Sequence, residues 1–433
     1  IHELVRQYAE RKLNAEMERS VATRTRHVKH YMELLQQAHA DLFGAHPQRA
    51  MRLIEHEIKN IRVAWAWAAM LDLFPEIEKG LESLWFFYDT RGWYREGEKM
   101  LDLAVDALHD DIDQRELCGK LLTRQGVLAS SLNWFSQAEA LLDEGLAIAR
   151  QLENPAEIAF GLVRRGSLAS FRSIFEECMI DMNEALAIYE IIDEPWDRAY
   201  TLNWFGLMRG SRDYVAQAAT IFRQLNSEWG IAVTSISQAF FALHDNKIET
   251  ARALGEQSLA ACQEIGIWWG IASASEVLGW VDLATDAYQD ALRHFREMFR
   301  ISVASQLWRY LAVAGIGIGR ALAELGEDAL ALEFLAAAYR YYDLQGRWFA
   351  YLDVEKRIPD ALYESVVAQS ARIADPVAML VGLEEPLNAF VQNLKPLLPA
   401  EADAGLLTER EIEVLGLLGE GMTNRAIADE LIL

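Results

Sequence analysis

The chain has 433 residues, of which 52% are hydrophobic and 24% are charged, a balance typical of a folded protein and not of a disordered one. Its formal net charge of −24 would repel phosphate groups, so most of the surface is excluded as a nucleic-acid or anionic-membrane surface, and any DNA contact has to be local. Three widely spaced cysteines exclude a disulfide framework and a CxxC metal pair, and they favour a reducing, cytoplasmic location. No apolar run reaches the length of a membrane-spanning helix, so we expect no membrane partner.

Apolar residues recur at helical spacing throughout residues 1–76, which predicts a helical segment there. Its clearest stretches are HELVRQYAERKL, RHVKHYMELLQQA and RLIEHEIKNIRVAWAWAAML. Because the chain opens without an initiating Met and without a signal-peptide pattern, we expect it to begin within a longer protein. His27 and His30 lie three apart, but no third ligand follows at metal-site spacing, so a solvated helix is the better interpretation and no metal is expected.

A repeat occupies the middle of the chain, and its most visible sign is WGIA at 229–232 and again at 269–272. The same offset of 40 positions, with one step of 33, links a row of small marker residues: Gly126, Gly166, Gly206, Ala239, Gly279 and Gly319. Seven positions before the markers stand small residues throughout: Gly119, Ala159, Ala199, Ala232, Ala272 and Ala312. Twelve positions after the markers the chain has a second column of small residues: Ala138, Cys178, Ala218, Ala251, Ala291 and Ala331. Four positions after each of these stands a large residue, except in the unit that has Gly255 there.

Small residues two helical turns apart let a second helix approach closely, so each unit is predicted to be a helical hairpin. Pro155 and Pro195 fall in the breaks between units. A degenerate earlier unit, in which Gly97 and Leu101 match the second-helix pattern, brings the expected number to about seven hairpins over residues 77–344. The pattern resembles the tetratricopeptide repeat, with units longer than the usual length, and it predicts an all-α tetratricopeptide-like solenoid.

The resemblance implies that first-helix residues line a concave face that binds a small effector or a peptide. By register, the residues expected there are Phe160, Tyr200, Asn203, Phe240, Glu276 and Trp280. The alternative for each of them is ordinary packing between repeats. Gly317 and Gly319 suggest a dinucleotide loop only superficially, because Leu322 replaces the third glycine of that motif.

Residues 345–404 hold five of the nine prolines and are predicted to be a linker, with YESVVAQSARIA and PLNAFVQNL forming short helices that cap the last repeat. Residues 405–433 predict the start of a helix-turn-helix. Thr408 and Glu411 form a capping box, Gly421 ends the first helix, and Thr423 starts the second.

This tail closely resembles the LuxR-type DNA-binding domain, with Ala426 as a departure from the usual Glu. The matching residues are Leu407, Thr408, Arg410, Glu411, Glu413, Val414, Leu415, Leu417, Leu418, Gly421, Thr423, Asn424, Ile427, Ala428 and Leu431. Thr423, Asn424 and Arg425 are candidates for phosphate contacts at a helix N-terminus, and plain capping is the alternative for them. The chain stops before the third helix, which reads bases in this family, so we expect no sequence recognition by the tail as it stands.

The N-terminal segment resembles the region that follows the ATPase domain in STAND-class signalling proteins. His2, Leu4, Val5, Arg6, Tyr8 and Ala9 carry the first part of the pattern, and Glu57, Asn60, Arg62, Ala64 and Trp65 carry the second. The resemblance implies an ATP-dependent LuxR-type regulator in which effector and ATP drive self-association and DNA binding. No phosphate loop occurs in these residues, so ATP is expected on an upstream domain, and no cofactor and no enzyme activity are expected here. The alternative function is a tetratricopeptide scaffold that recruits proteins without binding DNA.

Overall fold

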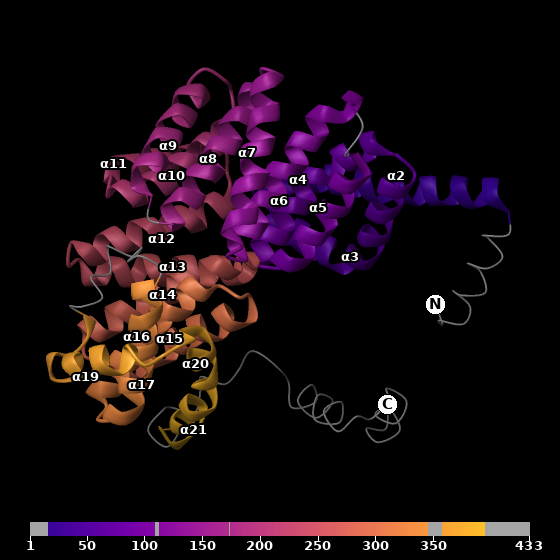
Figure 1. The fold of residues 1–433 in the computed structure, drawn as a ribbon. Coiled ribbons are helices and arrows are strands. Elements are labelled where there is room, and N and C mark those ends of the chain that lie inside the picture. The colour runs from indigo at the N-terminus through magenta and orange to yellow at the C-terminus, as the bar shows by residue number, and fades with distance from the viewer. Residues whose placement is uncertain (1–15, 109–111, 173, 345–356, 395–433) are drawn as a thin grey trace. The chain divides into compact units, whose positions relative to one another are not determined.

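The computed structural model describes residues 16–108, 112–172, 174–344 and 357–394. The regular elements in these ranges are α-helices and a short 3-10 turn, and no strand occurs in that part of the chain (Figure 1). The predicted all-α fold is therefore confirmed. The chain divides into two compact units, residues 1–383 and 384–433, and all helices before α21 belong to the first unit.

The described part of the N-terminal segment forms one long hairpin. Helix α2 (Met17–Phe43) packs along α3 (Pro47–Met70) and also along the next helix, α4 (Phe74–Arg91). Two residues of the STAND-like pattern, Trp65 and Glu57, connect α3 to neighbouring helices. The Trp65 indole is buried and donates to the Met100 carbonyl at 2.7 Å, and Glu57 accepts hydrogen bonds from Tyr31 and Asn60.

Seven further hairpins follow, as the repeat predicts. Their first helices are α4, α6 (Arg115–Ser131), α8 (Pro155–Phe171), α10 (Pro195–Arg209), α12 (Glu228–His244), α14 (Trp268–Ala284) and α16 (Trp308–Glu324). Their second helices are α5 (Tyr94–Leu108), α7 (Phe135–Gln151), α9 (Phe175–Tyr189), α11 (Arg212–Gln224), α13 (Ile248–Ile265), α15 (Tyr288–Ala304) and α17 (Asp328–Leu344), and a 3-10 turn η1 (Ile112–Gln114) precedes α6. Pro155 and Pro195 each begin a helix, where the missing amide donor costs nothing.

The marker residues lie at equivalent points of successive first helices and touch the partner helix, as predicted. A Cβ added at Gly126 would stand 2.8 Å from Leu142, and one at Gly319 would stand 2.6 Å from Leu335. These leucines are the large residues that follow the small second-helix column. At Gly126 and Gly319 the paired helices are therefore in such close contact that an added side chain would push them apart, and at Ala239 the marker's single methyl group is fully buried.

Most links between consecutive helices use one residue in the left-handed conformation. Gly92, Gly210, Gly266 and Gly326 hold it in four links, and Asp72, Asn133, Glu153, Asn226, Asn246, Asp286 and Gln306 hold it in others. In each case the next amide bonds back to a carbonyl five residues earlier, for example Trp134 to Ala129 at 3.0 Å. This closing motif satisfies the last carbonyls of a helix and fixes the angle at which the next helix leaves.

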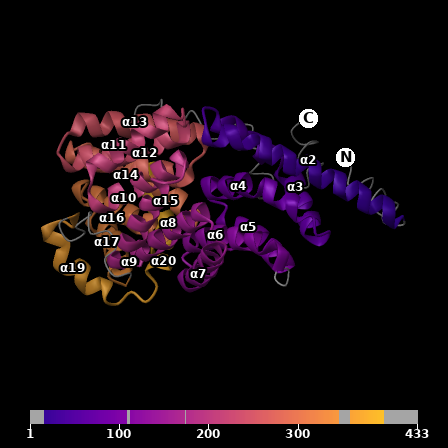
Figure 2. The same cartoon turned by 90° about the horizontal axis from the view of Figure 1, so that it is seen from above.

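The stack of hairpins turns so far that later helices meet the first ones. Helices α12, α13 and α14 contact α2, α3 and α4 respectively, and Figure 2 shows α13 and α12 beside the end of α2. At this junction Arg91 donates from Nη1 to the Ile265 carbonyl at 2.8 Å and from Nη2 to Glu55 at 2.8 Å. An aromatic cluster extends the contact: Phe43, Phe86, Trp196, Tyr200, Phe222, Trp229 and Trp269.

The C-terminal face of the last hairpin is covered by short helices. Helix α19 (Asp360–Ser370) packs on α17, and α20 (Pro376–Gly382) packs on both α16 and α17, with the fully buried Leu380 2.9 Å from the position of a Cβ on Gly315. Part of the YESVVAQSARIA stretch lies in α19, and α20 is a further short helix packed on the last hairpin. In the second unit the described residues form α21 (Glu384–Leu394). The boundaries proposed at 76, 344 and 404 stay predictions, and the helix-turn-helix lies outside the described residues.

None of the described helices is both long and apolar enough to cross a bilayer.

We predict that Gly319→Ala destabilises the chain and that Gly382→Ala does not. Alanine in a helix gains about 0.5–1 kcal/mol over glycine, but overpacking a tight contact costs about 1–3 kcal/mol. A Cβ at Gly319 would meet Leu335 and the Ala331 carbonyl, whereas a Cβ at the helical Gly382 has no atom within 4 Å. The urea midpoint should fall for Gly319→Ala and stay level or rise for Gly382→Ala. Equal midpoints would contradict the close-packing account.

Candidate functional site

The first helices of all seven hairpins converge on one cavity. Each of α4, α6, α8, α10, α12, α14 and α16 contributes to its wall. The cavity has a volume of about 170 Å³. This is roughly ten times the volume that a single buried water needs. Its lining includes Asp89, Ser130, Ser131, Arg164, Ser167, Phe171, Tyr200, Asn203, Ser237, Phe240, Ser273, Glu276, Arg309 and Tyr310.

The lining follows the repeat register. Around Gly206 the cavity takes Tyr200, Asn203 and Leu207, which are six and three positions before the marker and one after it. The residues in the same positions around Ala239 are Val233, Ile236 and Phe240, and around Gly279 they include Ser273 and Glu276. These lining positions share one face of each first helix. The marker residues lie on another face, which packs on the second helix of the same hairpin.

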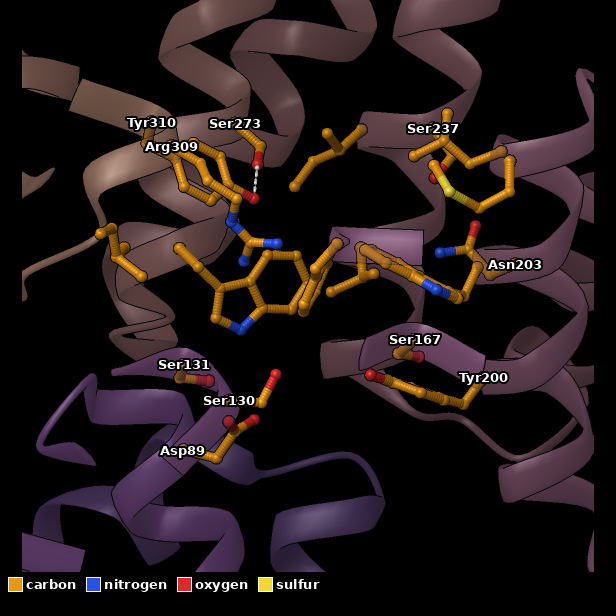
Figure 3. A pocket seen from close by; sticks show the side chains of 18 of the residues that line it. Asp89, Ser130, Ser131, Ser167, Tyr200, Asn203, Ser237, Ser273, Arg309 and Tyr310 are labelled. Atoms are coloured by element: carbon orange, nitrogen blue, oxygen red, sulfur yellow. Dashed lines mark hydrogen bonds between the residues drawn. The ribbon is translucent and has the colours of Figure 1, made fainter. Parts of the chain in front are cut away.

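Polar side chains lie on opposite walls of the cavity. Figure 3 shows Asp89, Ser130 and Ser131 on one wall, and Ser167, Tyr200 and Asn203 on another. Ser273 and Tyr310 join by a hydrogen bond of 3.1 Å beside Arg309, whose guanidinium lies 3.4 Å from the centre of the Phe171 ring. The remaining wall is apolar and aromatic, so the site combines apolar surface with a few oriented polar groups, as ligand pockets do.

Several buried polar atoms of the wall have no hydrogen-bond partner within the described residues. They are the Ser130 Oγ, the Arg164 Nε and the Asn203 Oδ1, in side chains that are 6%, 7% and 6% exposed. Leaving a buried donor or acceptor unpaired costs about 1–3 kcal/mol each. Atoms of this kind at a cavity wall can pair with a ligand or with water that enters the cavity.

Two carboxyl groups of the wall have raised pKa values. Burial raises the pKa of Glu276 to about 7, against opposing contributions from the hydrogen bond of Trp280 and from the charge of Arg357. The Asp89 side chain is partly exposed to the cavity. Burial in the surrounding protein nevertheless raises the pKa of Asp89 to about 6, while the positive charge of Arg164 lowers it in part. These acids are therefore neutral for part of the time near neutral pH.

Of the six residues predicted for the concave face, Tyr200, Asn203, Phe240 and Glu276 line the cavity. Phe160 and Trp280 do not, although they occupy the same register positions as Tyr200 and Phe240. Phe160 lies one turn before Arg164, whose guanidinium covers its ring at 4.7 Å. Trp280 lies one turn after Glu276, where it packs 4.9 Å from the Phe295 ring. Both are more than 90% buried behind the wall.

Three charged members of the wall, Asp89, Arg164 and Arg309, were not predicted from the sequence. Arg164 carried a signal, because it stands two positions before the marker Gly166, as Arg124 stands before Gly126. Asp89 and Arg309 come from the first and last hairpins, and only the closing of the stack brings them to the site.

Other candidates from the sequence do not join this site. Thr423, Asn424 and Arg425 lie outside the described residues. Gly317 and Gly319 lie inside α16, where they belong to a packed helix and not to a nucleotide-binding loop. Among the residues that the structure describes, no group of His, Cys, Asp and Glu is arranged to hold a metal.

Comparisons with known proteins give little further guidance. No protein-family model matches the chain, and no curated protein matches it. A solved structure of a Rap protein complexed with competence and sporulation factor is similar at 14% sequence identity, over 76% of this chain and 99% of that one, with a TM-score of 0.48. A likeness at this TM-score supports no argument about ligand or function.

We predict that Glu276→Gln stabilises the chain at high pH but not at low pH. A carboxyl whose pKa is raised by folding binds more protons in the native state, so stability falls as pH rises from the unfolded pKa near 4.5 to the folded pKa near 7. The glutamine is neutral and can still accept from Trp280. The melting temperature of the variant should exceed that of the unaltered chain at pH 8.5 and match it at pH 5. Glu256→Gln, at an exposed position on α13, is the control. A shift that is the same at both pH values would contradict the prediction.

Proposed function

We propose that this chain is the ligand-sensing part of a cytoplasmic, ATP-dependent transcriptional regulator of the LuxR type. In this proposal the cavity binds a small effector or a short peptide. Binding stabilises one arrangement of the solenoid, and that arrangement favours self-association and DNA binding by the complete protein. ATP would act on a domain outside this chain.

One observation carries the sensing role. Seven hairpins form the wall of a single cavity, and three successive first helices, α6, α8 and α10, place buried polar atoms without partners in it: the Ser130 Oγ, the Arg164 Nε and the Asn203 Oδ1. Packing alone does not favour burying such atoms, whereas a ligand that pairs with them offsets the cost. The aromatic and aliphatic remainder of the wall supplies apolar contact for the body of that ligand.

The regulatory role is supported by the sequence alone. The LuxR-type pattern of residues 407–431 and the STAND-type pattern of the first 65 residues lie at the two ends of the chain. A scaffold that recruits proteins is the alternative, and it would also use the solenoid. The two functions differ in the complete gene product, where the effector should change the affinity for DNA if the chain is a regulator, and should leave it unchanged if the chain is a scaffold.

We predict that Asn203→Ala weakens effector binding about two- to tenfold. The substitution removes an oriented amide from the cavity wall, and hydrogen bonds of this kind contribute about 0.5–1.5 kcal/mol, or more when the ligand group is charged. The effector is the compound that mass spectrometry identifies in the denatured extract of the purified chain, and its affinity is then measured by calorimetry. Asn183→Ala on the exposed face of α9 is the matched control. An equal loss in both variants, or no loss in Asn203→Ala, would contradict the assigned site.

A further inference from the structure

Among the arginines of the described chain, three are at least nine-tenths buried, and one of them differs from the others. Arg91 pairs with Glu55 at 2.8 Å, and Arg124 pairs with Glu157 and Glu82. Arg164 is 7% exposed, and no carboxylate of the described residues lies within ion-pair distance of it. Buried charges in proteins are nearly always paired, so this guanidinium requires an explanation.

The repeat makes Arg124 and Arg164 directly comparable. They occupy the same register position in successive first helices, α6 and α8. Glu157, the partner of Arg124, corresponds to Asp197 one repeat later, so the scaffold offers Arg164 an equivalent acid. The two nevertheless lie beyond ion-pair distance. Burial raises the pKa of Asp197 to about 6, and the charge of Arg164 lowers it only in part.

Aromatic rings hold Arg164 in place at the cavity wall. The centre of its guanidinium lies 4.3 Å from the Tyr200 ring, 4.7 Å from the Phe160 ring and 5.3 Å from the Trp85 ring. Stacking on rings leaves the edge of a guanidinium available to bind an anion in its plane. Its Nε has no partner within the described residues, which is also true of the Nε atoms of Arg91 and Arg124. Those two arginines bind carboxylates through their Nη atoms, whereas Arg164 has no such ion pair in the described chain.

We propose that the ligand of this cavity carries a carboxylate, and that Arg164 binds it. The inference rests on the proposed sensing function and names the chemical class of the effector: an organic acid, or a peptide with a free C-terminal carboxylate, with an apolar or aromatic body. Asn203 and Ser130 then pair with neutral polar groups of the same ligand.

The other charges of the wall favour a monoanion over a phosphate. Asp89 and Glu276 face the same cavity as Arg164 and Arg309, so a doubly charged group would meet two acids as well as two cations. The single negative charge of a carboxylate is balanced by the single positive charge of Arg164. Its body would lie against the aromatic and aliphatic wall formed by residues such as Phe240, Trp269 and Leu307.

The test compares acids with their own primary amides on the unaltered chain by calorimetry. The probes are 1-naphthaleneacetate, octanoate and N-acetyl-leucyl-tryptophan, each measured against the amide of the same body. Loss of a charge-assisted contact corresponds to roughly tenfold or more in affinity. We expect at least one acid to bind ten or more times tighter than its amide. In Arg164→Met that acid should bind at least tenfold more weakly, while its amide changes less than twofold.

Stability provides an independent readout. Arg164→Met strands no ion-pair partner, so its melting temperature should equal or exceed that of the unaltered chain, whereas Arg124→Met leaves Glu157 and Glu82 unpaired and should lower it.

Amides that bind as tightly as acids, or an Arg164→Met variant that weakens both equally, would overturn this inference and leave the sensing function standing. If no probe of either kind binds, the sensing function fails as well. Should Arg164→Met not fold, the comparison of acid with amide on the unaltered chain still decides.

Discussion

The close approach of the two helices in each hairpin is the constraint on which the rest of the structure depends. It occurs where a Gly or Ala of the first helix meets a small residue and then a large residue of the second, as Gly126 meets Ala138 and Leu142. Because this contact recurs at a fixed register, each hairpin presents the same face to its neighbour. The first helices therefore all contribute to one side of the stack, where their lining residues meet around a shared cavity.

Closure of the stack makes that surface a cavity instead of an open groove. Arg91 contributes most directly, because it reaches from α4 to the carbonyls of Ile265 and Gly266 at the end of α13. Gly266 has a positive φ of 82°, and an added Cβ would collide with the Arg91 guanidinium, so the turn needs glycine for both reasons. The tryptophans of successive first helices, Trp196 and Trp229, pack against Phe43 and Phe86 at the same junction. Polar atoms enclosed in this way are separated from water, so each pairing with a ligand contributes more than it would at a surface.

The sequence allowed the local architecture to be predicted but not the closed arrangement. The number of hairpins and the packing role of the markers follow from periodicity, because each depends on contacts within one or two units. Pro155 and Pro195 were predicted only to lie in breaks between units, and the structure shows that each starts a helix. Tyr200, Asn203, Phe240 and Glu276 were found from the same periodicity. Asp89 and Arg309 were not, since they come together only after the small rotations between hairpins have accumulated. Phe160 and Trp280 were predicted to line the cavity but do not. The repeat register predicts which helix face carries a residue, whereas side chains one turn away determine whether that residue reaches the cavity.

Helix α16 is the element through which the cavity would act on the rest of the chain. Its first turn carries Arg309 and Tyr310 in the cavity wall, and its later turns pack on α17 and on the capping helix α20, with Gly315 against Leu380. A ligand that binds one position of α16 better than another shifts the population of that position, and only by as much as the two affinities differ. Because α16 extends from the cavity wall to α20, a displacement at Arg309 would reach α20 through this helix, and α15 and α17, which pack closely on α16, would have to adjust to it. The last hairpin is thus the part of this solenoid that connects the cavity wall to the capping helix α20, while the earlier hairpins form the remaining walls.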